Sequence, residues 1–396
     1  MSMSATHDDS ITPLRIAALV IGAGPAGLAI GACLHRAHVP FRMVEAGGHV
    51  GEAWHHRYAR LHLHTVKRYS ALPFMPFPTR TPRYPSREQV IAYLETYARH
   101  FDLHPSFRQS VLSTRYQDGE WETVTSTTTY RSRFLIVCTG GNRQPIIPRW
   151  GGEEDFRGTL LHSGVYDRAA PFRGQRVLVV GLGNSGAEIA LDLCEGGAET
   201  TIAVRGGVNI VPRDPLGIPI QVLSIFAPSA RPQLTDVLMR PLWRRLVGDL
   251  RPLGLTTPPY GPAVSGTVHG RIPVIDVGTA RLLQARRIRV RGAIAQFTAD
   301  GVVFTDGSEA PFDAVVLATG FHPALDAFLP QAAAVTDERG YPLAHGQSTA
   351  LPGLYFCGFH NVPTGLLREI GREAKGISHA IARQMATAPE EEEQRT

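Results

Sequence analysis

Two glycine-rich turns of the same pattern constrain this chain more than any other feature of its sequence. The first, G-A-G-P-A-G at residues 22–27, directly follows the apolar run Ile16–Ile21. The second, G-L-G-N-S-G at residues 181–186, directly follows Val177–Val180. A buried strand that turns sharply into a helix is the context in which G-x-G-x-x-G indicates a dinucleotide-binding unit. Two such turns in one chain predict two bound dinucleotides and electron transfer between them.

Each glycine of the pattern has a physical role. The first permits the tight turn, the second lets the backbone approach a pyrophosphate, and the third lets the helix pack closely on the strand. The helix N-terminus supplies amide donors and the positive end of a dipole. We therefore expect cofactor contacts from both turns, at Gly22, Gly24, Gly27, Gly181, Gly183, Ser185 and Gly186.

The residue that follows the second strand of each unit distinguishes the two nucleotides. Glu45 lies 23 residues after Gly22, at the end of the strand 41–45, where an acid accepts hydrogen bonds from ribose hydroxyls. Arg205 takes the equivalent place after the strand 200–204, and an arginine there pairs with a 2′-phosphate. The first nucleotide is therefore expected to be FAD and the second NADPH.

The alternation of strands and helices predicts an α/β fold with two Rossmann-like, three-layer dinucleotide-binding domains. Three further apolar strands, at 134–137, 314–317 and 353–357, run into glycine-containing turns. We expect all three to complete the first sheet, so that the NADPH domain is inserted into the FAD domain. The ends of these strands add expected cofactor contacts at Gly140, Thr319, Gly320 and Gly358.

The expected FAD-binding domain comprises residues 14–168 and 313–387, and the NADPH-binding domain comprises residues 169–312. Proline-rich turns near Pro145 and Pro171 mark the crossover between them. The proline-rich, apolar segment 211–270 is expected to form a cap over the substrate side, with a plain surface excursion as the alternative. Residues 1–13 and 388–396 are expected to be flexible tails.

Composition excludes several functional classes. The net charge is +5, but the arginines are scattered and form no dense basic stripe, so nucleic-acid binding is not expected. The four cysteines contain no C-x-x-C pair, which indicates neither a zinc site nor a redox-active disulfide. No apolar run reaches membrane-spanning length and the polar N-terminus lacks a signal-peptide core, so we expect a cytoplasmic protein. The sequence carries no signal for the oligomeric state.

Residues 156–166, between the two turns, match the pattern F-x-G-x-x-x-H-x-x-x-Y. This pattern resembles the signature of the class B flavin monooxygenases. Tyr166 stands where the Baeyer–Villiger members of that class have tryptophan, which disfavours that branch. The resemblance makes His162 and Tyr166 candidate catalytic-site residues that organise the joint between the domains. The alternative for His162 is a linker histidine satisfied by backbone groups.

A closer resemblance runs through nearly all of residues 14–383. The runs Y-A-R-L-H-L-H at 58–64, A-L-P-F-M-P-F-P at 71–78 and P-V-I-D-V-G at 273–278 are similar to the YUCCA-type monooxygenases. In plants these enzymes convert indole-3-pyruvate to the auxin indole-3-acetate, with FAD, NADPH and oxygen. The chain departs from the family where C-T-G-G at 138–141 replaces A-T-G-E and where Leu182 and Ala187 occur in and beside the second turn.

The resemblance also indicates two side chains near the flavin. His64 occupies a position where many flavin monooxygenases have an asparagine that faces the reactive edge of the flavin. A role in holding the oxygenated flavin or NADP⁺ and a purely structural role are both open. Trp54 is expected to pack near the isoalloxazine, by analogy with family members. The nearby histidines His55, His56 and His62 lack an acid or thiol that would complete a ligand set, so no metal is expected.

These features together predict an FAD-dependent NADPH monooxygenase that takes molecular oxygen and a small-molecule substrate. The resemblance implies a C4a-(hydro)peroxyflavin that attacks the carbonyl of an aryl 2-oxo acid such as indole-3-pyruvate, with loss of carbon dioxide. The alternative is N- or S-oxygenation of a small amine or sulfide. A further alternative is a non-oxygenating NADPH-dependent flavin reductase.

Overall fold

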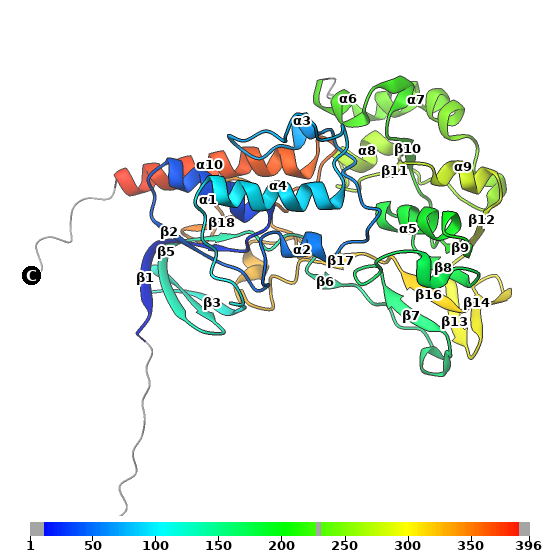
Figure 1. Ribbon diagram of the computed structural model, residues 1–396, viewed down its shortest axis with the longest axis horizontal. Coiled ribbons are helices and arrows are strands. Elements are labelled where there is room, and N and C mark those ends of the chain that lie inside the picture. The colour runs from blue at the N-terminus through cyan, green and yellow to red at the C-terminus, as the bar shows by residue number, and fades with distance from the viewer. Residues whose placement is uncertain (1–11, 227–230, 388–396) are drawn as a thin grey trace, which may run out of the picture.

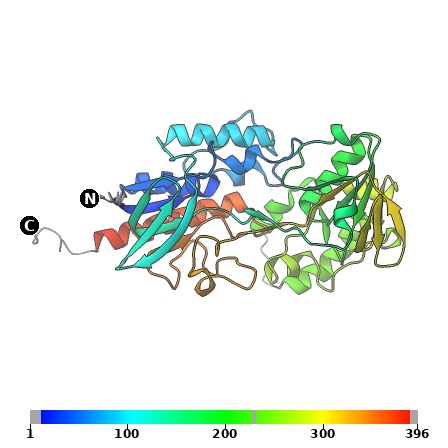
Figure 2. The ribbon, with the colours of Figure 1, turned by 90° about the horizontal axis from the view of Figure 1, so that it is seen from below.

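Two α/β units lie side by side along the long axis of the computed structural model, which describes residues 12–226 and 231–387 (Figure 1). The first unit, at the left of Figure 1, runs from β1 (Leu14–Ile21) and also contains the last helix, α10 (Leu366–Ala386). Both ends of the described chain therefore belong to the same unit, as the turned view in Figure 2 also shows. The expected tails lie almost entirely outside the described residues.

The first sheet is built around β1 and β5 (Thr129–Val137), which pair in parallel. Its other strands are β2 (Phe41–Val44), β3 (Val111–Gln117), β4 (Glu120–Thr125) and β18 (Leu354–Phe356). The order is β2-β1-β5-β4-β3, and β18 pairs with the second half of β5. β3 and β4 run antiparallel, while β2 and β18 are parallel to the central pair. The expected strands at 134–137 and 353–357 are thus confirmed in this sheet.

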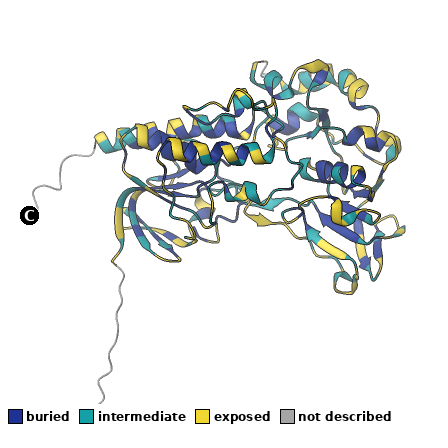
Figure 3. Ribbon diagram, viewed as in Figure 1, coloured by how far each residue is buried: buried dark blue, intermediate teal, exposed yellow. Residues whose placement is uncertain are grey.

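Three helices cover one face of the first sheet because each carries an apolar side. α1 (Pro25–Arg36) is buried from Ala26 to Leu34 and packs on α10, and α4 (Arg87–His100) lies beside it. Figure 3 shows the buried residues of these helices turned toward the sheet. α4 begins at a capping box, in which Ser86 and Gln89 each accept a hydrogen bond from the other's backbone amide. The opposite face is covered by residues 325–335.

A second, fully parallel sheet forms the core of the other unit. Its strands are β7 (Thr159–His162), β8 (Arg176–Val180), β9 (Glu199–Ala203), β12 (Ile288–Arg291) and β16 (Ala314–Leu317). The order is β12-β9-β8-β16-β7. Helices α5 (Asn184–Glu195) and α9 (Thr279–Gln284) pack on one face. The other face packs on a small antiparallel sheet of β13 (Ile294–Thr298), β14 (Gly301–Phe304) and β15 (Glu309–Pro311).

One expectation about the sheets is wrong: the strand at 314–317 does not complete the first sheet. β16 lies between β8 and β7 in the second sheet, and β7 belongs there too, although the expected boundary at residue 168 places it with the FAD domain. In both units, a strand that runs into a glycine-containing turn lies beside the strand that leads into the G-x-G-x-x-G turn. This local pattern therefore cannot tell to which of the two sheets such a strand belongs. The Cys138 carbonyl faces Gly22 in the first unit, and the Ala318 carbonyl faces Gly181 in the second.

Residues 211–226 and 231–270, the described part of the segment 211–270, form a helical layer beside the second sheet (Figure 1). Residues 227–230 of the expected cap lie outside the described residues. It contains α6 (Ile220–Phe226), α7 (Pro232–Val247) and α8 (Pro262–Thr267). At its base, β10 (Ile210–Pro212) pairs in parallel with β11 (Val274–Asp276). The layer also reaches the first unit, because the ring of Phe226 packs edge-on against Tyr69 of α3 (Lys67–Ser70).

The chain passes between the units twice, and the two passages lie side by side. β6 (Gln144–Pro145) leaves the first unit and β17 (Phe321–His322) returns to it, and the two strands pair antiparallel. The crossover expected near Pro145 is therefore one half of a two-stranded ribbon. The remaining short elements are α2 (Glu52–His55) and the 3-10 turns Glu153–Asp155, Ala170–Phe172, Pro215–Gly217, Arg251–Leu253 and Ala332–Ala334.

Several kinds of feature are absent from the part of the chain that the structure describes. None of its helices combines the length and the apolar character that a membrane crossing requires. No three side chains of histidine, cysteine, aspartate or glutamate come together there in a group that could hold a metal ion. All four cysteines are buried and free.

Glu373 of α10 is a buried carboxyl group beside the end of β18. Its Oε2 accepts a hydrogen bond from the Gly358 amide at 2.8 Å, while its Oε1 is buried without a partner among the described residues. Burial, with a smaller contribution from the nearby Glu369, raises the pKa of Glu373 to about 7. The charged form is thus disfavoured in the folded protein.

Replacing Glu373 with glutamine is expected to stabilise the protein above pH 7. Since the folded pKa lies above the usual 4.5, the wild type binds the proton more tightly when folded, and its stability falls as the pH rises from about 4.5 through 7. The full effect is about 3 kcal/mol. Urea unfolding at pH 5 and pH 8 measures it, with exposed Glu338→Gln as the matched control. Parallel pH profiles for Glu373→Gln and wild type would contradict the prediction.

Candidate active site

The first glycine turn brings backbone groups closer together than any side chain would allow. A Cβ on Gly22, whose φ is +104°, would lie 2.7 Å from the Cys138 carbonyl oxygen, and a Cβ on Gly27 would lie 1.8 Å from the Gly22 carbonyl oxygen. Gly24, in contrast, has open space beside it and precedes the first residue of α1. The turn therefore packs tightly on its inner side and leaves the helix amides accessible on its outer side, as a bound pyrophosphate requires.

The second glycine turn repeats this geometry position by position. A Cβ on Gly181, with φ of +100°, would lie 2.6 Å from the Ala318 carbonyl oxygen, and a Cβ on Gly186 would lie 2.1 Å from that of Gly181. Open space again adjoins the middle glycine, Gly183, which precedes α5. Both turns thus fit a dinucleotide, and Ser185 lies in the first turn of α5.

Glu45 and Arg205 follow the strands that flank the glycine turns. The Glu45 carboxylate accepts hydrogen bonds from the backbone amides of Ala23 at 2.7 Å and Gly47 at 2.8 Å. It therefore lies beside the first turn, where a ribose is expected, and its contact with that sugar stays a prediction. Arg205 is exposed two residues after β9, whose last residue, Ala203, accepts a hydrogen bond from the Gly181 amide.

The other expected cofactor residues lie at the carboxyl ends of the strands. Gly140 and Gly320 have positive φ and open space around them, whereas Gly358 packs against Ala26 of α1. The Thr319 hydroxyl donates to the Ile146 carbonyl at 2.5 Å. Sequence reasoning missed Thr139, whose hydroxyl is buried beside the first turn with no hydrogen-bond partner in the described structure. An unused donor at this edge fits a site for the flavin nucleotide.

Trp54 lies in the short helix α2, which begins directly after Gly51. Its side chain is partly buried against the core of the first unit. The neighbouring His56 ring bonds to Glu52 at 2.8 Å, and His62 donates to the Arg60 carbonyl at 2.7 Å. These histidines thus have separate partners rather than a shared one. The contact of Trp54 with the isoalloxazine stays a prediction.

His64 joins the two units through a buried carboxylate. Its Nε2 donates to Oε1 of Glu188, which is 4% exposed on α5, in the second turn of that helix. Tyr58 is also 4% exposed. It packs in the core of the second unit, although it belongs to the same stretch of chain as His64. Burial, and next the charge of Glu188, raise the pKa of Tyr58 well above its usual value, while Ser185 opposes that rise. These polar side chains form one cluster between the units.

Sequence reasoning missed Glu188 and Tyr58 as members of this site. The only local signal is that Glu188 is a charged residue among Gly186, Ala187 and Ile189, on a helix side that is otherwise apolar. A charge is rarely buried unless it is paired, so such a position indicates a partner from elsewhere in the chain.

His162 ends β7 and Tyr166 packs in the core of the second unit, and their expected role at the joint between the units stays a prediction. His162 donates from Nε2 to the Gly320 carbonyl at 3.1 Å and accepts at Nδ1 from the Gly164 amide at 3.0 Å. Burial lowers the pKa of His162, which keeps the ring neutral. Tyr166 is 1% exposed and donates to Asp192 of α5 at 2.7 Å. Both side chains are therefore bonded to groups of the second unit, His162 at the point where the chain leaves it.

A cleft of about 600 Å³ adjoins the second glycine turn. Gly183 lines one side, and Asn209 and Arg271 line the flanks next to β10 and β11. Arg339, which follows the segment packed under the first sheet, also lines this cleft. The cleft therefore extends from the nucleotide turn of the second unit to Arg339 of the first unit.

Gln221 of α6 fastens the helical layer to the first unit. It is 1% exposed, accepts a hydrogen bond from the Val66 amide at 2.7 Å and donates to the Thr364 carbonyl at 2.8 Å. Val66 lies two residues after His64, and Thr364 lies two residues before α10. One buried amide thus fixes the position of both segments relative to α6.

Known proteins resemble this chain in sequence and in structure. A family model described as pyridine nucleotide-disulphide oxidoreductase matches residues 19–215. Indole-3-pyruvate monooxygenase YUCCA4 of Oryza sativa subsp. japonica is 38% identical over 361 residues, which cover 86% of this chain and 82% of that protein. The chain belongs to the YUCCA family of flavin monooxygenases.

Two further comparisons extend the YUCCA relationship to both units. Indole-3-pyruvate monooxygenase YUCCA6 of Arabidopsis thaliana is 37% identical over 370 residues, covering 89% of this chain and 88% of that protein. A mutant flavin monooxygenase from Stenotrophomonas maltophilia matches the structure with a TM-score of 0.73 at 25% identity, covering 94% of this chain and 99% of that one. The expected flavin monooxygenase with two Rossmann-like units, using FAD and NADPH, is confirmed.

Arg205→Ala is expected to lower kcat/KM for NADPH by about 10- to 100-fold. A hydrogen bond from a guanidinium to a phosphate contributes about 1.5–3 kcal/mol, and this bond is lost. NADH has no 2′-phosphate and serves as the internal control, so its kcat/KM should change little. Steady-state oxidation of both coenzymes measures the ratio. An equal loss with NADH and NADPH would show that Arg205 does not contact the 2′-phosphate.

Proposed function

We propose that this protein catalyses the NADPH- and oxygen-dependent oxidative decarboxylation of an aryl 2-oxo acid such as indole-3-pyruvate. The observation that carries the proposal is the similarity over 86% of the chain to a relative named indole-3-pyruvate monooxygenase. In the balanced reaction, one oxygen atom of O₂ enters the shortened acid and the other leaves as water. The carboxyl group of the substrate leaves as carbon dioxide, and NADPH supplies the electron pair.

The first turn and Thr139 would hold FAD, and the second turn with Arg205 would hold NADPH. The chemistry that reduced FAD supplies when bound is the activation of molecular oxygen. The task of the protein is to orient the reactants and to exclude water, because a wet site would release hydrogen peroxide.

The bond between His64 and Glu188 supports a role for His64 in that task. Because the carboxylate accepts from Nε2, the tautomer and direction of the ring are fixed and Nδ1 is left for another partner. His64 comes from the first unit and Glu188 from the nucleotide helix of the second. The ring is therefore oriented only when both units are in place, which ties a fixed hydrogen-bonding group to the assembled site.

The helical layer supports the exclusion of water. Gln221 ties α6 to Val66, which lies two residues after His64 and directly before α3, and to the turn before α10. A Cβ on Gly365 would lie 2.7 Å from the Gln221 amide nitrogen, so the layer meets the first unit without a gap there. The segment 211–270 would thus act as a cap over the substrate side.

Product analysis under ¹⁸O₂ tests the proposed reaction. The FAD-loaded protein is incubated with NADPH and either indole-3-pyruvate or methyl p-tolyl sulfide. We expect carbon dioxide and indole-3-acetate that carries one ¹⁸O atom, with one NADPH consumed for each product molecule. Formation of the sulfoxide alone would favour heteroatom oxygenation and overturn the proposal. NADPH oxidation without any oxygenated product would indicate a flavin reductase.

His64→Ala is expected to lower coupled turnover at least about tenfold, which corresponds to about 1.4 kcal/mol, and to raise the hydrogen peroxide formed per NADPH. Glu188→Gln should act in the same direction, because the ring loses its carboxylate partner. The double variant should be little worse than His64→Ala alone, since one interaction is removed by either change.

His62→Ala is the matched control for this pair, because His62 is exposed two residues away and its ring bonds to the Arg60 carbonyl. Its peroxide yield should equal that of the wild type. If the effects of His64→Ala and Glu188→Gln simply add, the two side chains do not act as one unit.

A further inference from the structure

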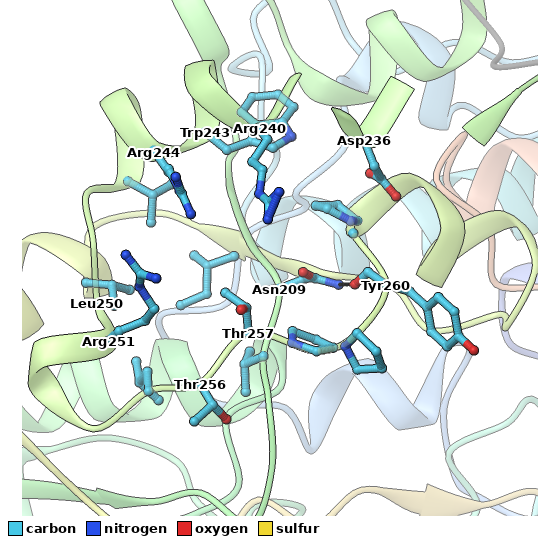
Figure 4. Close-up of a pocket in the computed structure, with 18 of the residues that line it drawn as sticks. Asn209, Asp236, Arg240, Trp243, Arg244, Leu250, Arg251, Thr256, Thr257 and Tyr260 are labelled. Carbon is cyan, nitrogen blue, oxygen red and sulfur yellow. Dashed lines mark hydrogen bonds between the residues drawn. The ribbon is translucent and has the colours of Figure 1, made fainter. Parts of the chain in front are cut away.

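A second cavity lies within the helical layer, apart from the nucleotide turns. It has a volume of about 370 Å³ and is enclosed by α7, the strand β10 and the segment 256–262 (Figure 4). No glycine of either turn lines it, and neither does Arg205. It shares Asn209 and Tyr260 with the 600 Å³ cleft, so the two spaces are neighbours with a common wall.

Two guanidinium groups that line this cavity form no close ion pair, although two carboxylates, Asp236 and Asp249, line it as well. Arg240 and Arg244 are one turn apart on α7, and Figure 4 shows Arg240 pointing into the cavity. Neither forms an ion pair with any acidic side chain of the described residues. Both arginines are exposed, so they attract an anion through a solvent-screened field rather than through burial of the charges.

The acidic side chains nearest to these arginines already have partners. Asp236 accepts hydrogen bonds from the amides of Ala263 at 2.8 Å and Val264 at 3.0 Å, at the start of α8. Asp249 is bound by Arg251, with Nη2 and Oδ2 2.5 Å apart, and this bond lowers the pKa of Asp249 to about 2. Asp249 is therefore paired with Arg251, whereas Asp236 keeps its negative charge because its partners are neutral amides. Three arginines and two carboxylates line the cavity, so one net positive charge is left for a ligand.

The remaining walls are apolar and aromatic, so the ligand has an apolar body. They are formed chiefly by Val208, Ile210, Val247, Leu250, Leu255 and Trp243. A volume of about 370 Å³ suits a small organic molecule and is too small for a whole dinucleotide. A planar aromatic ring packs well beside Trp243, and guanidinium groups match the geometry of a carboxylate.

We propose that this cavity is a second ligand site, which binds a small aryl carboxylate. The choice of an aryl body rests partly on the proposed function, because the substrate and product of that reaction are both aryl carboxylates. The product acid, bound beside the common wall at Asn209, would lie next to the cleft of the second glycine turn.

Calorimetric titration of the FAD- and NADP⁺-loaded protein with indole-3-acetate tests the site. We expect a binding event that the double variant Arg240→Gln/Arg244→Gln weakens at least tenfold. Arg245→Gln is the matched control, because Arg245 is exposed on the same helix but does not line the cavity, and it should leave binding unchanged. Indole-3-acetamide has the same shape without the charge and should bind at least tenfold more weakly than indole-3-acetate.

Three results would overturn the site. These are equal affinity in the double variant and wild type, equal affinity for the acid and the amide, or the absence of binding with NADP⁺ bound. If indole-3-acetate binds only after NADP⁺ is removed, it occupies the nucleotide cleft and not the proposed site. Turnover of indole-3-pyruvate is measured separately on the same samples. If turnover is absent while the double variant still loses binding, the proposed function fails and the site stands.

Discussion

The packing of each unit depends on a close backbone contact between the start of a helix and the glycine turn before it. A side chain on the third glycine of the turn would prevent this contact. In both units, a Cβ on the third glycine, Gly27 or Gly186, would lie about 2 Å from the carbonyl oxygen of the first glycine. The absence of side chains there lets α1 and α5 pack onto their strands. Because the helices start at that place and in that direction, their amide ends face outward at the carboxyl edge of each sheet. Both cofactor sites are a consequence of this backbone contact.

The features that a short stretch of sequence determines could be predicted. The glycine turns and the apolar strands beside them each depend on a few consecutive residues. The sheet to which β16 belongs does not, because the four residues 314–317 are apolar and would fit in either parallel sheet. Their place is decided by the partners on both sides, β8 and β7, and by the Ala318 carbonyl that faces Gly181. Pairing of distant strands is a property of the whole fold.

The same distinction explains which site residues the sequence revealed. The residues of the glycine turns could be identified because their spacing is itself the signal. Glu188 lies 124 residues from His64, and Gln221 lies 155 residues from Val66, so their contacts exist only after the units have assembled. A buried glutamate and a buried glutamine are costly alone and are accommodated here by partners from the other unit. The assembled site therefore contains polar contacts for which no motif exists.

The ribbon of β6 and β17 limits how the two units can move relative to each other. Because the two passages of the chain are bonded along Gln144–Pro145 and Phe321–His322, they bend together rather than independently. A ribbon of this kind flexes most readily across its thin dimension, so a swing of one unit would follow a single pivot. His162 is bound to the Gly320 carbonyl directly before β17, at the root of that pivot. This hydrogen bond therefore restrains the ribbon at the point where the chain leaves the second unit.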